Sequence, residues 1–325
     1  MPKFQDTDFL YLSAMVRELE NHLISTDQLD RMIRAETDAD ALKVLEECGY
    51  GLVEADNPIM LDRALSQKAT AILKELAARG PDPAIVDVFR VKYDYHNAKV
   101  LIKAEFADVD GDRLMSDGGR VSRAIFEDRY YDGLPAGVPL ALGNATLAAR
   151  TLVAQSGDAQ AADILLDRAM YQEYLDLAKA MEDAYFGGYI RLSIDGINLR
   201  TAVRAVRMGM TPEALIDALI PGGNISPARV VAGSGLQSLY VGTALEKAAR
   251  LAPAAMTGGD LTAFEREVDN ALLRYVGMGS YKAFGIAPVL AYLSSLEAEA
   301  MSVRIVMASR SAGLTPEQIR ERLRG

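Results

Sequence analysis

The sequence is poor in the side chains that catalysis and metal binding most often use. Among 325 residues there is one cysteine, Cys48, and there are two histidines, His22 and His96. A disulfide within the chain is therefore impossible, and a zinc site of cysteine and histidine or a cysteine–histidine catalytic pair is nearly excluded. We expect a structural role for His96 and a reducing, cytosolic setting for the chain.

Positive charge and long apolar runs are also scarce. The chain has 35 Lys and Arg against 45 Asp and Glu, a formal net charge of −10. Such a chain repels nucleic-acid phosphates and anionic lipid headgroups, so neither is expected as a partner. The longest weakly polar stretch, 284–296, contains Pro288 and is shorter than the roughly 20 residues of a membrane-spanning helix. We therefore expect no direct membrane insertion.

Motifs that bind nucleotides or calcium are missing or incomplete. There is no Walker A loop, so we expect the chain not to bind ATP. The segment 233–238 has serine in place of the third glycine of a dinucleotide-binding turn. The acidic run 108–112 would need glycine and glutamate where Arg113 and Gly119 stand to form a calcium-binding EF-hand loop. No catalytic residue, cofactor site or metal site is predicted.

Helical periodicity is what the sequence has in abundance. Half of the residues are hydrophobic and a quarter are charged, which is ample material for a core. Apolar residues recur every three or four positions over 166–185, the spacing of one helix face. Residues 25–28 and 315–318 have the pattern of capping boxes at helix starts. The best strand candidate, 228–232, stands alone, so we predict an all-α fold.

Three segments share a pattern of an acid, a small polar residue and a base. The acid precedes the base by five residues and the small polar residue precedes it by two. The sets are Asp94, Asn97 and Lys99; Asp195, Asn198 and Arg200; and Glu299, Ser302 and Arg304. The bases are 101 and 104 residues apart, and Gly118-Gly119 recurs as Gly222-Gly223 after 104 residues. This period predicts three helical repeats, over 1–118, 119–222 and 223–325.

Two interpretations of these nine residues remain open. Residues three to five apart lie near one face of a helix, so each acid and base can form a local ion pair worth a few tenths of a kcal/mol. Alternatively, the three sets surround a pseudo-threefold axis and face a shared surface. A carboxylate pair of an enzyme is disfavoured, because Glu297 and Glu299 are two residues apart and point about 200° away from each other around a helix.

The segment Asp94-Tyr95-His96-Asn97-Ala98-Lys99 resembles the DYHN-x-K signature of the C subunits of bacterial and archaeal V/A-type ATPases. Their eukaryotic counterpart is the d subunit of the V-ATPase. Further family patterns follow in order at 166–171, 195–201 and 288–304, and the likeness extends essentially from end to end. The third repeat departs from the pattern, with Glu299 in place of aspartate and Ser302 in place of asparagine.

The resemblance implies a funnel-shaped protein of three related helical domains without an active site. Its narrow base would rest on the membrane ring of proteolipids (the c, K or L subunits), and its open side would receive the central stalk of the D and F subunits. A transient contact with the membrane stator is also compatible with the family. The implied function is a non-catalytic part of the rotor, peripheral to the membrane on its cytoplasmic side, for H+ or Na+ transport linked to ATP hydrolysis or synthesis. The alternative is a helical-repeat scaffold outside rotary ATPases, for which repeats of roughly 34–47 residues would be expected.

Overall fold

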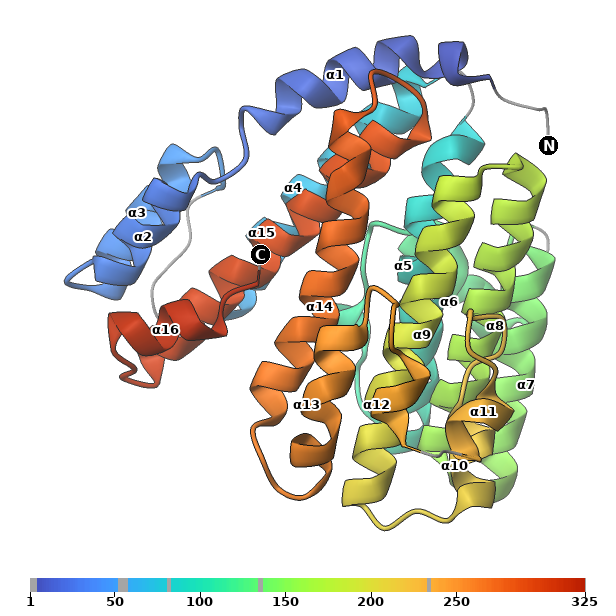
Figure 1. Ribbon diagram of the computed structural model, residues 1–325. Coiled ribbons are helices and arrows are strands. Elements are labelled where there is room, and N and C mark those ends of the chain that lie inside the picture. The colour runs from blue at the N-terminus through green and yellow to red at the C-terminus, as the bar shows by residue number, and fades with distance from the viewer. Residues whose placement is uncertain (1–4, 52–57, 81–82, 134–136, 233–234, 325) are drawn as a thin grey trace. The chain divides into compact units, whose positions relative to one another are not determined.

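The computed structural model describes residues 5–51, 58–80, 83–133, 137–232 and 235–324. Within these ranges the regular structure is entirely helical and contains no strand (Figure 1), which confirms the all-α prediction. The α-helices are α1 (Leu10–Glu20), α2 (Thr26–Arg34), α3 (Asp38–Glu47), α4 (Pro58–Arg79), α5 (Pro83–Ala107), α6 (Arg123–Tyr131), α7 (Leu140–Ser156), α8 (Ala159–Met181), α9 (Ala184–Arg207), α10 (Pro212–Ala218), α11 (Pro227–Val231), α12 (Leu236–Leu239), α13 (Glu246–Met256), α14 (Leu261–Gly277), α15 (Ile286–Ser311) and α16 (Pro316–Arg322). The 3-10 turns are η1 (Asp6–Phe9), η2 (Asp112–Leu114) and η3 (Met278–Tyr281).

Local signals in the sequence determine several helix starts. Ser25 and Thr315 both form complete capping boxes, at the starts of α2 and α16. The strand candidate 228–232 instead forms most of the short helix α11, which begins with a proline at its first turn. Residues 233 and 234 of the incomplete dinucleotide motif lie outside the described residues.

The predicted helix over 166–185 is interrupted. Helix α8 ends at Met181, because Glu182 adopts a left-handed conformation with φ of 53°. The apolar spacing continues across this break, so Tyr185 belongs to α9. Of the expected apolar face, Leu166 and Tyr174 are buried in α8.

The chain forms two compact units. The first contains the described residues of 70–190 and 220–222. In this unit α5 packs against α6, α7 and α8, and α7 packs along α8 (Figure 1). The buried side chains of these helices include Val91, Tyr95, Phe126, Leu142 and Leu166.

The second unit contains the described residues of 4–69, 191–219 and 223–325. One of its apolar cores is built on α9 and α11–α14 and includes Leu199, Val203, Tyr240 and Phe264. Another core unites the two ends of the chain. Its members come from α2, α3, α4, α15 and α16, among them Met32, Leu45, Leu65, Val303 and Ile319. Helix α15 lies along α1, α2, α3, α14 and α16.

Candidate functional site

The nine residues of the repeated pattern lie on α5, α9 and α15, three helices of 24 to 26 residues. In each helix the acid and the small polar residue are buried, whereas the base is partly or fully exposed. A buried carboxylate is costly unless it is hydrogen-bonded or paired. The partners of these side chains therefore show what the pattern does.

Each acid accepts a hydrogen bond from a backbone amide in a loop. The pairs are Asp94 Oδ1 with Val121 N at 3.2 Å, Asp195 Oδ1 with Ile225 N at 3.1 Å, and Glu299 Oε2 with Ile24 N. In every case a serine follows the donor and is the N-cap of the next helix, α6, α11 or α2. The three acids thus perform the same task, which is to hold the loop in front of a helix.

The repeated Gly-Gly pair explains how two of the loops approach their acid. A Cβ atom at Gly119 would lie 2.4 Å from Asp94 Oδ1, and one at Gly223 would lie 2.3 Å from Asp195 Oδ1. No larger residue fits without moving the loop or the carboxylate. These glycines are required because of this close approach.

Each base pairs with an aspartate on a different helix. The pairs are Lys99 Nζ with Asp167 Oδ1 at 2.7 Å, Arg200 Nη2 with Asp269 Oδ1, and Arg304 Nε with Asp62 Oδ1 at 2.6 Å. Their aspartates belong to α8, α14 and α4. The local pairs expected within α5, α9 and α15 are therefore replaced by pairs between helices. Whether the bases face a common axis stays a prediction.

The sequence also carries a signal for these aspartates, separate from the pattern of acids and bases. Leu61-Asp62-Arg63-Ala64 recurs as Leu166-Asp167-Arg168-Ala169 after 105 residues, and Val268-Asp269 follows 102 residues later. This spacing matches the period of the bases.

The first contact set is Asp94–Val121 with Lys99–Asp167. The second is Asp195–Ile225 with Arg200–Asp269, and the third is Glu299–Ile24 with Arg304–Asp62.

Additional polar contacts surround the first set. Arg120 Nε donates to Asp94 Oδ2 at 2.6 Å, and Arg120 Nη1 donates to Glu173 Oε1 at 2.5 Å. Burial alone lowers the pKa of Arg120, but its hydrogen bonds to Glu173 and Asp94 outweigh burial and raise that pKa. Tyr95 donates to Glu173 at 3.0 Å. The guanidinium therefore stays charged and joins α5 to α8.

The remaining signature side chains of α5 bind the segment that leads to this loop. Asn97 donates from Nδ2 to Ser116 O at 2.9 Å and accepts at Oδ1 from Ser116 N at 2.7 Å. His96 Nε2 lies 2.9 Å from Leu114 O. Both contacts position backbone, as a structural role for His96 requires.

In the second set, neutral donors hold the Asp195 carboxylate. Asn224 donates to its Oδ2 from the backbone at 3.2 Å and from Nδ2 at 2.8 Å. Burial raises the pKa of Asp195, and the hydrogen bonds from Ile225 and Asn224 only partly oppose this shift. Tyr240 donates to the Asp195 carbonyl oxygen at 3.2 Å.

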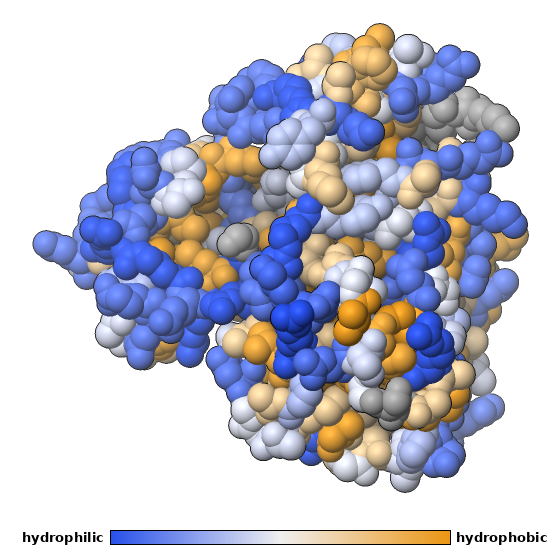
Figure 2. Space-filling model, in the orientation of Figure 1, coloured by the Kyte–Doolittle hydropathy of each residue, from blue (hydrophilic) through white to orange (hydrophobic). Residues whose placement is uncertain are grey.

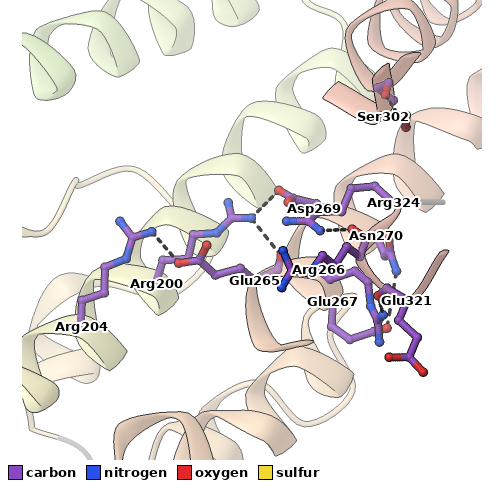
Figure 3. A network of polar contacts seen from close by, with 12 residues as sticks. Arg200, Arg204, Glu265, Arg266, Glu267, Asp269, Asn270, Ser302, Glu321 and Arg324 are labelled. Carbon is purple, nitrogen blue, oxygen red and sulfur yellow. Dashed lines mark hydrogen bonds and ion pairs between the residues drawn. The ribbon is translucent and has the colours of Figure 1, made fainter. Parts of the chain in front are cut away.

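The ion pair of the second set belongs to a larger polar network (Figure 3). Arg200 and Arg204 point from α9 toward Asp269 and Glu265 of α14. Asp269 also accepts from Arg324 Nε at 2.9 Å, so one carboxylate binds two guanidinium groups. The network fastens the end of the chain to α9 through α14.

In the third set, Glu299 gathers donors from three segments near the start of the chain. Besides the Ile24 amide it accepts from the Tyr50 hydroxyl and, at 3.1 Å, from Lys68 Nζ. Lys68 also lies over the Tyr50 ring, 4.0 Å from its centre. Burial and the neighbouring carboxylate of Glu299 raise the pKa of Tyr50, so its hydroxyl remains a donor.

The contacts of the three sets join acids and bases to structural partners and do not pair a nucleophile with a base. Among the described residues there is also no group of three or more His, Cys, Asp or Glu side chains placed to hold a metal ion. The same residues include no helix that is both long enough and apolar enough to cross a membrane. The chemistry that the geometry supports is the fixing of helices and loops.

Comparison with known proteins gives matches along nearly the whole chain. Residues 12–322 match the family of the ATP synthase (C/AC39) subunit. The C subunit of the V-type sodium ATPase of Enterococcus hirae is 24% identical over 320 residues, which cover 96% of this chain and 97% of that protein. The C subunit of the V-type ATP synthase of Thermus thermophilus is 25% identical over 322 residues, covering 97% and 98% of the two chains. The C subunit of the A-type ATP synthase of Haloquadratum walsbyi is 24% identical over 344 residues, covering 96% of each. The protein therefore belongs to the family of ATP synthase C/AC39 subunits.

Proposed function

We propose that the chain is a non-catalytic part of the rotor of a V/A-type rotary ATPase, coupling a central stalk of D and F subunits to the membrane proteolipid ring. The observation that carries this proposal is the end-to-end match to relatives named as the C subunits of V-type and A-type ATPases. Ion transport and nucleotide chemistry then belong to other subunits. A transient contact with the stator and a position at the cytoplasmic face of the membrane are part of the same proposal.

The three contact sets suit a part that transmits torque. A coupling protein must resist twisting, and hydrogen bonds to buried charged groups are directional and worth about 1.5–3 kcal/mol each. Such bonds join each of α5, α9 and α15 to a separate loop. The buried acids on this view provide stiffness.

The same contacts support three related repeats around a pseudo-threefold axis. With repeats at 1–118, 119–222 and 223–325, the acid and base at the end of one repeat bind the loop and aspartate of the next. Within this proposal the partly exposed Lys99, Arg200 and Arg304 face the shared surface. The funnel that would receive the stalk on one side and meet the ring on the other is what the family resemblance implies.

The surface offers both polar and apolar contacts to partners. Figure 2 shows hydrophilic side chains over much of the face in view, with apolar areas between them. Large apolar side chains are exposed on both units, among them Tyr281 at 90% and Leu140 at 83%. The net charge of −10 adds a long-range component to binding.

The test is the binding of a purified D–F stalk complex to the immobilised chain, measured by surface plasmon resonance over a salt series. We expect specific binding that weakens as ionic strength rises, because salt screens charges over about 8–10 Å at physiological strength. Binding that does not change with salt would favour a mainly apolar interface, and absence of binding would contradict the proposed partner.

Calorimetric titration with Mg-ATP is expected to give no heat of binding, and micromolar affinity would contradict the non-catalytic role.

A further inference from the structure

The third contact set differs from the other two in sequence separation. Asp94 and Asp195 bind amides 27 and 30 residues further along the chain. Glu299 instead binds an amide 275 residues earlier, and Arg304 pairs with an aspartate 242 residues earlier. The third set therefore joins α15, the last helix that carries the repeated pattern, to the beginning of the chain.

The contacts follow the order of a closed cycle. The first set runs from α5 to the loop before α6, the second from α9 to the loop before α11, and the third from α15 to the loop before α2. Head-to-tail contacts of one kind close into a ring when the last repeat meets the first. The apolar core shared by α2, α3, α4, α15 and α16 lies at this closing contact.

The loop of the closing contact has no glycine at the critical position. Gly119 and Gly223 each stand two residues before the amide donor, and His22 occupies that position before Ile24. The two glycines allow a carboxylate to lie where a Cβ atom would be. A histidine in this place carries a Cβ atom, so a carboxylate cannot occupy the same position.

A cavity beside the closing contact is bordered by this loop, α14 and α15. This cavity of about 320 Å³ is lined by Leu23 and Ile24 of the loop and by Glu299 and Ser302 of α15. Ser302 stands where the other helices have asparagine, and its hydroxyl donates to Ala298 O of its own helix at 2.8 Å. The asparagine Asn97, by contrast, holds its loop segment with two hydrogen bonds. Ser302 thus bonds within its own helix, and Glu299 makes the hydrogen bond to the closing loop.

We propose that Glu299 closes the cycle and that its extra methylene group compensates for the missing glycine at position 22. Glutamate reaches the Ile24 amide across a gap that aspartate, one methylene shorter, does not span. The glutamate of the third repeat and the missing glycine in the loop before α2 are then one compensated change. This closure rests on the three repeats of the proposed function.

The test is a double-mutant cycle in the full chain, followed by hydrogen exchange of individual amides. Glu299→Asp should accelerate exchange of the Ile24 amide about tenfold or more, since a hydrogen bond to a charged group is lost. The amides of Val121 and Ile225 should be unaffected. In a His22→Gly background the loop can approach, so the same substitution should accelerate the Ile24 amide less than about threefold.

Two further variants separate length from charge and from general damage. Glu299→Gln keeps the length and an acceptor oxygen, so it should accelerate the Ile24 amide less than Glu299→Asp does. Glu297→Asp shortens another acid on the same helix and should change none of the three amides. The proposal is overturned by an unchanged Ile24 amide in Glu299→Asp or by equal acceleration at all three amides. It is also overturned if Glu299→Asp has the same effect with and without His22→Gly, or if Glu299→Gln acts as strongly as Glu299→Asp.

Discussion

Gly223→Ala tests the reason for the Gly-Gly pair most sharply. The added Cβ atom would lie 2.3 Å from Asp195 Oδ1 and 3.1 Å from Ile194 Cγ2. A carbon–oxygen contact of that length is about 1 Å too short, since nonbonded carbon atoms prefer about 3.5–4.0 Å. The loop or the carboxylate must therefore move by about this distance.

The expected loss of stability follows from the hydrogen bonds that such a shift would break. Asp195 accepts from the Ile225 amide at 3.1 Å and from the Asn224 amide at 3.2 Å, and neither survives a movement of about 1 Å. Each hydrogen bond to a charged group is worth about 1.5–3 kcal/mol, and water or rearrangement recovers part of the loss. Alanine also restricts the unfolded chain, which offsets about 0.4–1 kcal/mol. We expect a net destabilisation of about 2–4 kcal/mol.

A matched glycine serves as the control. Gly277 ends α14 with φ of −58° and ψ of −27°, and a Cβ atom there would meet no atom within 4 Å. Gly277→Ala should therefore stabilise the chain by about 0.4–1 kcal/mol. Both variants are compared by urea denaturation followed by far-ultraviolet circular dichroism. If Gly223→Ala is as stable as Gly277→Ala, the close approach to Asp195 does not explain the glycine.

Three further predictions concern the charged groups. In urea denaturation, Asp269→Asn should lower the free energy of unfolding by about 1.5–3 kcal/mol and Asp62→Asn by less than about 1 kcal/mol. The reason is exposure, since the side chains of Arg200 and Asp269 are 19% and 21% exposed and those of Arg304 and Asp62 are 46% and 60% exposed. Equal losses would argue against this ranking. Burial raises the pKa of Asp195 in the fold, so the folded chain binds more protons than the unfolded chain above the usual aspartate pKa of about 3.9. Stability should then fall as pH rises through that window and level off above the folded pKa, more in the wild type than in Asp195→Asn, and parallel pH profiles would contradict the shift. Arg200→Glu sets a carboxylate against Asp269, so it should lower the melting temperature as well as stalk binding, and an unchanged melting temperature would show that the ion pair is dispensable.

The fold class and some helix starts could be predicted from the sequence, because they depend on residues that are close together in the chain. Helical periodicity and the capping boxes at Ser25 and Thr315 identified the fold class and two helix starts, since both signals act within one or two turns. The end of α8 at Met181 was missed because the apolar spacing continues past the left-handed Glu182. The apolar segment 228–232 was too short to distinguish a strand from the helix that it forms.

Only the part of the candidate site whose residues lie close together in the chain could be named from the sequence. The repeated acid, small polar residue and base were visible because their spacing is local. Their partners are 27 to 275 residues away, so only the repetition of the partner segments around Asp62 and Asp167 carried a signal. The link between His22 and Glu299 depends on the distance from a loop to a helix, which no spacing in the sequence encodes.

Affinity purification from mildly solubilised membranes of its own organism shows whether this chain works as part of a rotor. A tagged full-length chain should bring down the D and F subunits together with the proteolipids, in amounts absent from an untagged control. Recovery of the chain without any of these subunits, while the ATPase itself remains intact in the same membranes, would rule out a place in the rotor and favour a helical scaffold outside rotary ATPases.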